Sequence, residues 1–206
     1  MVSSVISRLN DRRDAAADLG EDAGFTLIEL MVVLLILAIL LAIAIPTFLG
    51  VTGGANDRSA QSNLNTALTT AKSAATESQQ SYGNVTEAQL VSNEPSLSWV
   101  NGTGVGAAGP VSVYLDPSAN GGNGVVLASW SKNAAGTCWY AVDNLAPVTV
   151  GANTPYITAG GTSVVSSVPN AAGTFYGKQT GVADTACSAG TAPGATVVWG
   201  TQFPAS

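Results

Sequence analysis

The strongest constraint on the fold is a run of apolar residues near the start of the chain. The stretch from Leu30 to Ile45 holds sixteen consecutive apolar residues, and the run continues to Leu49 with only Pro46 and Thr47 interrupting it. Because each residue of an α-helix rises 1.5 Å, a helix of about 20 residues spans about 30 Å, the thickness of the hydrocarbon core of a bilayer. We therefore expect residues 25–49 to form one membrane-spanning helix.

The segment before the apolar run differs from a secretory signal peptide, in which a short positive end leads into an apolar stretch and the cleavage site follows that stretch. Residues 1–24 are mostly polar, with three arginines and five acidic residues. Short segments with arginine near a membrane span tend to remain in the cytoplasm. The sequence therefore predicts a cytoplasmic N-terminus and an exported C-terminal part. A chain of 206 residues has room for one domain besides the anchor.

The two cysteines, Cys138 and Cys187, lie 49 residues apart in the part that we expect to be exported. Oxidising compartments favour disulfides, so we predict one bond between them. On the chain-entropy model, closing a loop of this length stabilises the fold by about 4 kcal/mol. Two buried free thiols are the alternative. The sequence has no C-x-x-C motif, which argues against redox or zinc chemistry at these positions.

A second helical pattern follows the apolar run. Three glycines, Gly50, Gly53 and Gly54, predict a flexible joint between the two. Residues 50–83 then show the three-and-four spacing of an amphipathic helix. The expected inner face of this helix consists of Leu64, Leu68, Ala71, Ala75, Ser78 and Tyr82, widened by Ala60, Ala67 and Ala74. A face made of such small residues permits close approach to a sheet or to another helix.

Beyond Gly83 the pattern changes to short alternating runs bounded by Gly, Pro and Asn, which is typical of strands and turns. The predicted strands are 111–115, 125–130, 137–142, 174–178 and 195–199. We expect residues 101–110 and 144–163 to be exposed loops. Consecutive short strands without intervening helices predict an antiparallel sheet that needs the long helix as cover. The predicted fold class is therefore α+β.

The apolar run carries one charged residue near its start, Glu29. An ionised residue at mid-membrane costs about 3 kcal/mol, and such residues usually have a partner and a function. The sequence has no basic residue between positions 14 and 57. Cleavage between Gly24 and Phe25 would create a partner, because the new α-amino group would be a cation close to Glu29. At the positive end of the helix dipole, that cation would need a carboxylate for neutralisation.

The stretch from Gly24 to Met31, GFTLIELM, followed by an apolar run and Pro46, closely resembles the cleavage and methylation signature of type IV prepilins. Residues 55–64 are similar to the second half of the pilin helix in Gram-positive bacteria. The resemblance implies that a prepilin peptidase cuts after Gly24 and N-methylates Phe25. It further implies that Glu29 pairs with the Phe25 ammonium group of a neighbouring subunit during assembly, and that Pro46, with Gly50, allows local unwinding of the helix.

On this resemblance, residues 1–24 are a removed leader, 25–49 the membrane and later filament-core helix, 50–83 its amphipathic second half, and 84–206 an extracellular β-rich domain. The implied function is that of a type IV pilus subunit for adhesion, motility or DNA uptake. Its implied partners are the prepilin peptidase, an assembly platform with its ATPase, and further copies in a helical filament. It would lie in the cytoplasmic membrane before assembly and on the cell surface afterwards. The alternatives are a pseudopilin of a type II secretion or competence system, and a membrane-anchored extracellular binding protein.

Other functions find little support in the sequence, and we expect neither a cofactor nor a bound metal. The stretch 104–109 matches G-x-G-x-x-G, but a proline follows it where a dinucleotide site needs a helix. Residues 116–121 resemble half of a calcium loop whose twelfth position is Leu127 instead of glutamate. The chain has no histidine and no G-x-S-x-G, so an enzyme is not expected. Four basic residues against eight acidic ones after residue 24 argue against direct binding of nucleic acid.

Overall fold

The structure is a computed structural model of the chain. It describes residues 25–101, 110–115, 122–133, 135–147, 156–157, 163–164, 169, 171–190 and 197–203. The chain divides into two compact units, Met1–Thr47 and Phe48–Ser206, which are described separately. Helix α2, Leu27–Glu77, begins in the first unit and ends in the second.

In the first unit, α2 consists almost entirely of Leu, Ile, Val and Ala. These residues are apolar on every side of the helix, and none of them is buried within the chain. Only Glu29, in the first turn, carries a charge here. A helix that is apolar all round requires an apolar environment on all sides.

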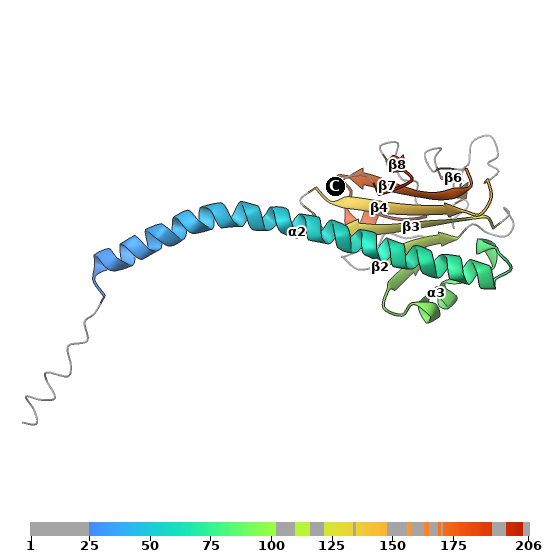
Figure 1. Cartoon of the computed structure of the whole chain (residues 1–206), viewed down its shortest axis with the longest axis horizontal. Helices are drawn as coiled ribbons and strands as arrows, with labels where there is room; N and C mark the ends of the chain where they lie inside the picture. The colour runs from blue at the N-terminus through green and yellow to red at the C-terminus, as the bar shows by residue number, and fades with distance from the viewer. Residues whose placement is uncertain are drawn as a thin grey trace, which may run out of the picture. The chain divides into compact units, whose positions relative to one another are not determined.

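The second unit contains the rest of α2 and a six-stranded sheet in the order β1-β2-β3-β4-β7-β8. Its strands are β1 (Ser98–Asn101), β2 (Pro110–Leu115), β3 (Gly124–Ser131), β4 (Thr137–Asn144), β7 (Gly173–Thr180) and β8 (Val198–Gly200). A separate pair joins β5 (Tyr156–Ile157) to β6 (Ser163–Val164). The short helical elements are η1 (Tyr82–Asn84), α3 (Glu87–Asn93) and η3 (Asp184–Ala186). The α+β class is therefore confirmed, with the long helix packed on a mostly antiparallel sheet (Figure 1).

The central strands β3 and β4 are buried on both faces of the sheet, and successive residues point to opposite faces. Towards α2, the core combines alternate strand residues such as Val125, Leu127 and Trp139 with the inner face of the helix. That inner face consists of Ala60, Leu64, Ala67, Leu68, Ala71, Ala74 and Ala75. Small side chains on the helix let its backbone lie close to the sheet.

The opposite face of the sheet carries the intervening residues, among them Val126, Cys138 and Tyr140. Residues 181–190 cross this face after β7. Cys187 contacts β4 through the disulfide with Cys138, and the Ala189 N–H donates to Ser112 Oγ of β2 at 2.9 Å. In the sheet order, β2 lies two strands beyond β4. This segment therefore covers the second apolar face, and we call residues 181–190 the strap.

Four of the predicted strands are confirmed with small changes at their ends, namely β2, β3, β4 and β7. The fifth, predicted at 195–199, is β8 at Val198–Gly200, and residues 195–196 lie outside the described residues. Strand β1 was not predicted. It pairs with β2 in parallel, whereas the other pairings within the six-stranded sheet are antiparallel, as predicted. Helix α3 and the β5–β6 pair were also not predicted, and the latter falls in the expected loop 144–163.

The predicted end of the long helix at residue 83 was wrong. Helix α2 ends at Glu77, and Gln79 and Gln80 adopt left-handed backbone conformations with φ of 62° and 57°. Two such residues in a row cannot continue a right-handed helix. Ser78 and Tyr82 therefore lie beyond the helix. Tyr82 is nevertheless fully buried, because the turn returns it to the core.

Candidate functional site

The candidate site is the N-terminal end of α2, where the sequence predicts processing. The helix begins at Leu27, and Phe25 precedes it in a non-helical conformation with 89% of its surface exposed. The helix that we expected to begin at residue 25 therefore begins two residues later, and Phe25 lies outside it. The helix starts after Thr26, which acts as its N-cap. Gly24, on the other side of the predicted cleavage point, lies outside the described residues.

Thr26 and Glu29 form a reciprocal capping box. The Thr26 N–H and the Thr26 hydroxyl both donate to Glu29 Oε2, at 2.9 and 2.8 Å, and the Glu29 N–H donates to Thr26 Oγ1 at 3.3 Å. These bonds satisfy two backbone N–H groups at the helix start that would otherwise have no partner within the helix. Glu29 thus already has donors within its own chain.

Sequence reasoning did not identify Thr26, although its signal was present. The stretch Thr26-Leu27-Ile28-Glu29 matches the S/T-x-x-E pattern of a capping box directly before an apolar run. The same signal, Thr86-x-x-Gln89, precedes α3, and there too both reciprocal bonds are present.

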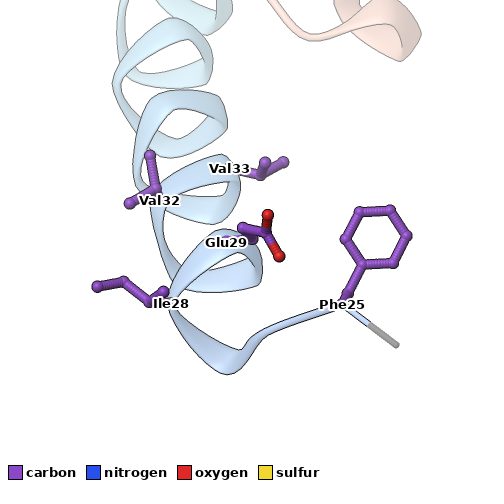
Figure 2. A pocket seen from close by; sticks show the side chains of 5 residues that line it. All are labelled: Phe25, Ile28, Glu29, Val32 and Val33. Atoms are coloured by element: carbon purple, nitrogen blue, oxygen red, sulfur yellow. The ribbon is translucent and has the colours of Figure 1, made fainter. Parts of the chain in front are cut away.

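Phe25 and Glu29 line a shallow open groove with Ile28, Val32 and Val33. Figure 2 shows the Phe25 ring and the Glu29 carboxylate on the same side of the helix start. The groove is apolar apart from the carboxylate, and Oε2 is the atom that accepts both bonds from Thr26. A carboxylate beside the residue that would become the N-terminus can neutralise an α-ammonium group there, because the two groups carry opposite charges.

The apolar half of α2 extends from this site to Leu49. Among the described residues, α2 is the one helix long and apolar enough to cross a membrane, with a mean hydropathy of 3.2 over its most apolar window. None of that window is buried within the chain. The length and apolar composition of this half suit the membrane anchoring of a prepilin.

Pro46 lies inside α2 without interrupting it, and the helix also continues through Gly50, Gly53 and Gly54. The Thr47 hydroxyl donates to the Ile43 carbonyl at 3.1 Å, which gives that carbonyl a partner near the proline. The local unwinding implied for Pro46 and Gly50 is therefore absent from this structure, and unwinding during assembly stays a prediction.

Cys138 and Cys187 form the predicted disulfide, with their Cα atoms 5.4 Å apart. Both residues are fully buried. The bond ties the strap to the centre of the sheet, next to Tyr140. Burial raises the pKa of the Tyr140 hydroxyl well above its ordinary value, and that hydroxyl donates to Gln179 Oε1 at 3.2 Å.

Two buried carboxylates were not singled out from the sequence. Asp57 of α2 accepts from Asn133 and from the Trp139 indole N–H. Asp143 of β4 accepts from the Tyr82 hydroxyl at 2.6 Å and pairs with Lys72 at 3.0 Å. Their donors come from residues 31 to 82 positions away in the sequence, so no local pattern could have revealed these contacts.

The described part of the chain contains no candidate metal centre. No group of three or more His, Cys, Asp or Glu residues lies close enough there to hold a metal ion. The glycine-rich stretch 104–109 and the calcium-like stretch 116–121 both fall outside the described residues.

Comparison with known protein families places the site in context. Residues 21–45 match the family model described as the prokaryotic N-terminal methylation motif. The chain carries this motif. Together with the long apolar N-terminal helix, the motif fits a type IV pilin-like prepilin. The match covers the candidate site and most of the apolar half of α2. A search of the curated proteins gave no match, and neither did a search of the solved structures.

Proposed function

We propose that this chain is the precursor of a type IV pilus subunit. In this role it is inserted in the cytoplasmic membrane through the first half of α2, with residues 1–24 in the cytoplasm. A prepilin peptidase hydrolyses the bond between Gly24 and Phe25 with one water. A methyl group from a sulfonium methyl donor is then transferred to the new Phe25 amine, which loses one proton. The processed subunits then leave the bilayer and polymerise into a helical filament on the cell surface, which serves adhesion, motility or DNA uptake.

The observation that carries this proposal is the methylation motif at residues 21–45 on a helix that is apolar on every side. The motif implies processing by a prepilin peptidase and pilin-type assembly. Apolar residues all around a helix need lipid in the membrane and other copies of the helix after export. The capping box adds support, because it keeps the Glu29 carboxylate within one turn of the future N-terminus.

The role that we propose is structural, and the chain is the substrate of the peptidase, not an enzyme. Further partners in the proposal are an assembly platform in the membrane and its cytoplasmic ATPase. A pseudopilin would share the motif and the helix, but would form a short piston instead of a long surface filament. A membrane-anchored binding protein would keep residues 25–49 as a permanent anchor and would not need Glu29.

The experiment is intact-mass analysis with N-terminal sequencing of two fractions, membranes and material sheared from the cell surface. For the wild type we expect a chain that begins at N-methylated Phe25 in the sheared fraction. For Glu29→Ala we expect processed protein in the membrane and loss from the sheared fraction. Glu77→Ala, which removes an exposed acid from the other end of α2, is the matched control and should behave as the wild type.

The other outcomes decide between the alternatives. A processed chain that never reaches the sheared fraction in the wild type would favour the pseudopilin. A chain that keeps residues 1–24 and stays in the membrane in all three strains would refute the pilin proposal and leave α2 as an anchor.

A further inference from the structure

The middle of α2, residues 46–54, consists largely of residues that are unfavourable in a helix. Pro46 lacks the N–H group for the helix ladder, and Gly50, Gly53 and Gly54 follow within eight residues. Proline and glycine are the two least favourable residues in a helix interior. We call residues 46–54 the weak segment.

The glycines of the weak segment are not required by packing within the chain. A Cβ atom added at Gly50 or Gly54 would have no atom within 4 Å, and one at Gly53 would lie 3.6 Å from the Asn133 Cβ, an ordinary contact. Alanine would therefore fit at these positions and would favour the helix. The sequence keeps residues that weaken the helix where the fold of a single chain does not need them.

Directly after the weak segment, a polar cluster holds α2 to the turn between β3 and β4. The Asn133 amide donates to Asp57 Oδ1 at 2.9 Å and to Thr137 Oγ1 at 2.7 Å, and the Trp139 indole N–H donates to Asp57 Oδ1 at 3.1 Å. One residue earlier, the Asn56 amide donates to the Lys132 carbonyl at 2.7 Å. We call Asp57, Asn133, Thr137 and Trp139 the Asp57 cluster.

Burial along α2 changes at this cluster. No residue of the helix before Asp57 is buried, whereas Asp57 is 6% exposed and the buried inner face continues from Ala60. Within the described residues, Asp57 has no basic partner in a salt bridge, so amide and indole donors are what stabilise it. If α2 moved away from the sheet at Asp57, the buried Trp139 indole would lose its acceptor, and the half-buried Asn133 amide would lose one of its two. Leaving a buried donor unsatisfied is unfavourable, so opening past Asp57 meets a discrete barrier.

We propose that the Asp57 cluster is a conformational stop. The weak segment opens locally, and the cluster confines this loss of helix to residues 46–54 so that the sheet keeps its cover. Opening these nine residues would lengthen the chain there by roughly 16 Å, because an extended residue spans about 3.3 Å against 1.5 Å in a helix. The device belongs to the fold of the chain and does not depend on the pilin proposal.

The test is amide hydrogen exchange, measured by mass spectrometry on the full chain in detergent micelles, processed or unprocessed. In the wild type we expect the amides of residues 50–55 to exchange at least about tenfold faster than those of residues 60–75. In Asp57→Ala, fast exchange should extend to residues 56–64, with rates there rising on the order of tenfold or more. Glu77→Ala is the matched control on the same helix and should leave both regions unchanged.

Two further variants keep the test decisive. Asn133→Ala removes one donor of the cluster and should move the boundary of fast exchange in the same direction by a smaller amount. Gly50→Ala should slow exchange in residues 50–55 several-fold without an effect beyond Asp57. Exchange in β3 and β4 shows whether a variant has unfolded as a whole. Equal protection of residues 50–55 and 60–75 in the wild type would overturn the proposal. So would an unmoved boundary in Asp57→Ala and Asn133→Ala with the sheet intact.

Discussion

The two halves of α2 belong to one helix but depend on different surroundings. From Leu27 to Ile45, each large apolar side chain is between 48% and 75% exposed. From Asp57 to Ala75, alanines and two leucines form a single stripe that is at most 6% exposed. The second half is covered by the sheet of its own chain, whereas the first half needs a cover that none of the described residues supplies. Residue size follows the same division, since bulky residues surround the first half and small ones line the second.

The largest expected effect comes from placing the same charge in each half. Ala67→Glu puts a carboxylate at a fully buried position, and we expect it to lower the free energy of unfolding of the second unit by about 4 kcal/mol or more. Leu37→Glu should change that free energy by less than about 0.5 kcal/mol but hinder membrane insertion, which it makes less favourable by about 3 kcal/mol.

Both charge variants are measured by denaturant unfolding of the full chain in detergent, followed by tryptophan fluorescence, since Trp139 is fully buried. The membrane-extracted fraction reports on insertion. Equal destabilisation of the second unit by both variants would contradict the comparison, because the two halves would then share one core.

The next effect concerns the sheet face that α2 does not cover. Replacing both cysteines, with Cys138→Ser and Cys187→Ser together, should lower the free energy of unfolding by about 2–4 kcal/mol. We expect the strap to lose protection against hydrogen exchange before the inner face of α2 does, because the disulfide holds the strap and not the helix. Reduced wild-type protein is the control. Simultaneous loss of protection on both faces would show that the second unit unfolds without such an order.

The contrast between the two halves could be predicted in large part from sequence, because both signals are local. Sixteen consecutive apolar residues predict a span, and the three-and-four spacing of Leu64, Leu68 and Ala71 predicts a buried face. The central strands follow from their alternation for the same reason. The two capping boxes were equally local, and Thr26 and Thr86 could have been found from their spacing to Glu29 and Gln89.

What could not be predicted depends on contacts between distant parts of the chain. The helix end at Glu77 reflects two left-handed glutamines, a residue type with no preference for that conformation. Tyr82 is buried because its hydroxyl reaches Asp143, 61 residues away. Strand β1 pairs with β2 in parallel. Its four residues show little alternation of apolar and polar side chains, so the sequence predicts neither the strand nor the direction of its pairing.

A smaller effect tests how the end of the second half is attached. Asp143 lies 7% exposed between the Lys72 ammonium and the Tyr82 and Thr174 hydroxyls. Asp143→Asn should lower the free energy of unfolding by about 2 kcal/mol, because the charge-assisted bonds are weakened at a buried site. Lys72→Met should cost less than about 1 kcal/mol, since the lysine is 43% exposed and its pair with Asp143 is partly screened by solvent. Denaturant unfolding measures both free energies. A larger destabilisation by Lys72→Met than by Asp143→Asn would contradict the view that the buried Asp143, and not the exposed Lys72, dominates this contact.

The smallest effect belongs to the start of the first half, where Thr26 and Glu29 hold each other. Thr26→Val keeps the shape of the side chain but removes its hydroxyl, so the first turn should lose about 1 kcal/mol of stability. Thr26→Ser should retain both hydroxyl bonds. Thr26→Asp should keep the acceptor for the Glu29 N–H and the backbone donor to Glu29 Oε2, but its ionised side chain cannot donate to Oε2. Amide exchange of residues 27–30, measured in detergent, should therefore be fast in the valine variant and close to the wild type in the other two.

The yield of sheared filaments then separates helix capping from the placement of the carboxylate. If Thr26 acts only as a cap, Thr26→Asp should assemble like the wild type. If Thr26 also holds Glu29 in place for the Phe25 ammonium group, the filament yield of Thr26→Asp should be as low as that of Thr26→Val. Thr26→Ser should then give the wild-type yield. Because the aspartate also adds a charge near Glu29, Thr26→Asn, which caps without that charge, is the control. A wild-type yield from the valine variant would show that Glu29 needs no help from its own chain, and that the first half of α2 depends on neighbouring copies alone.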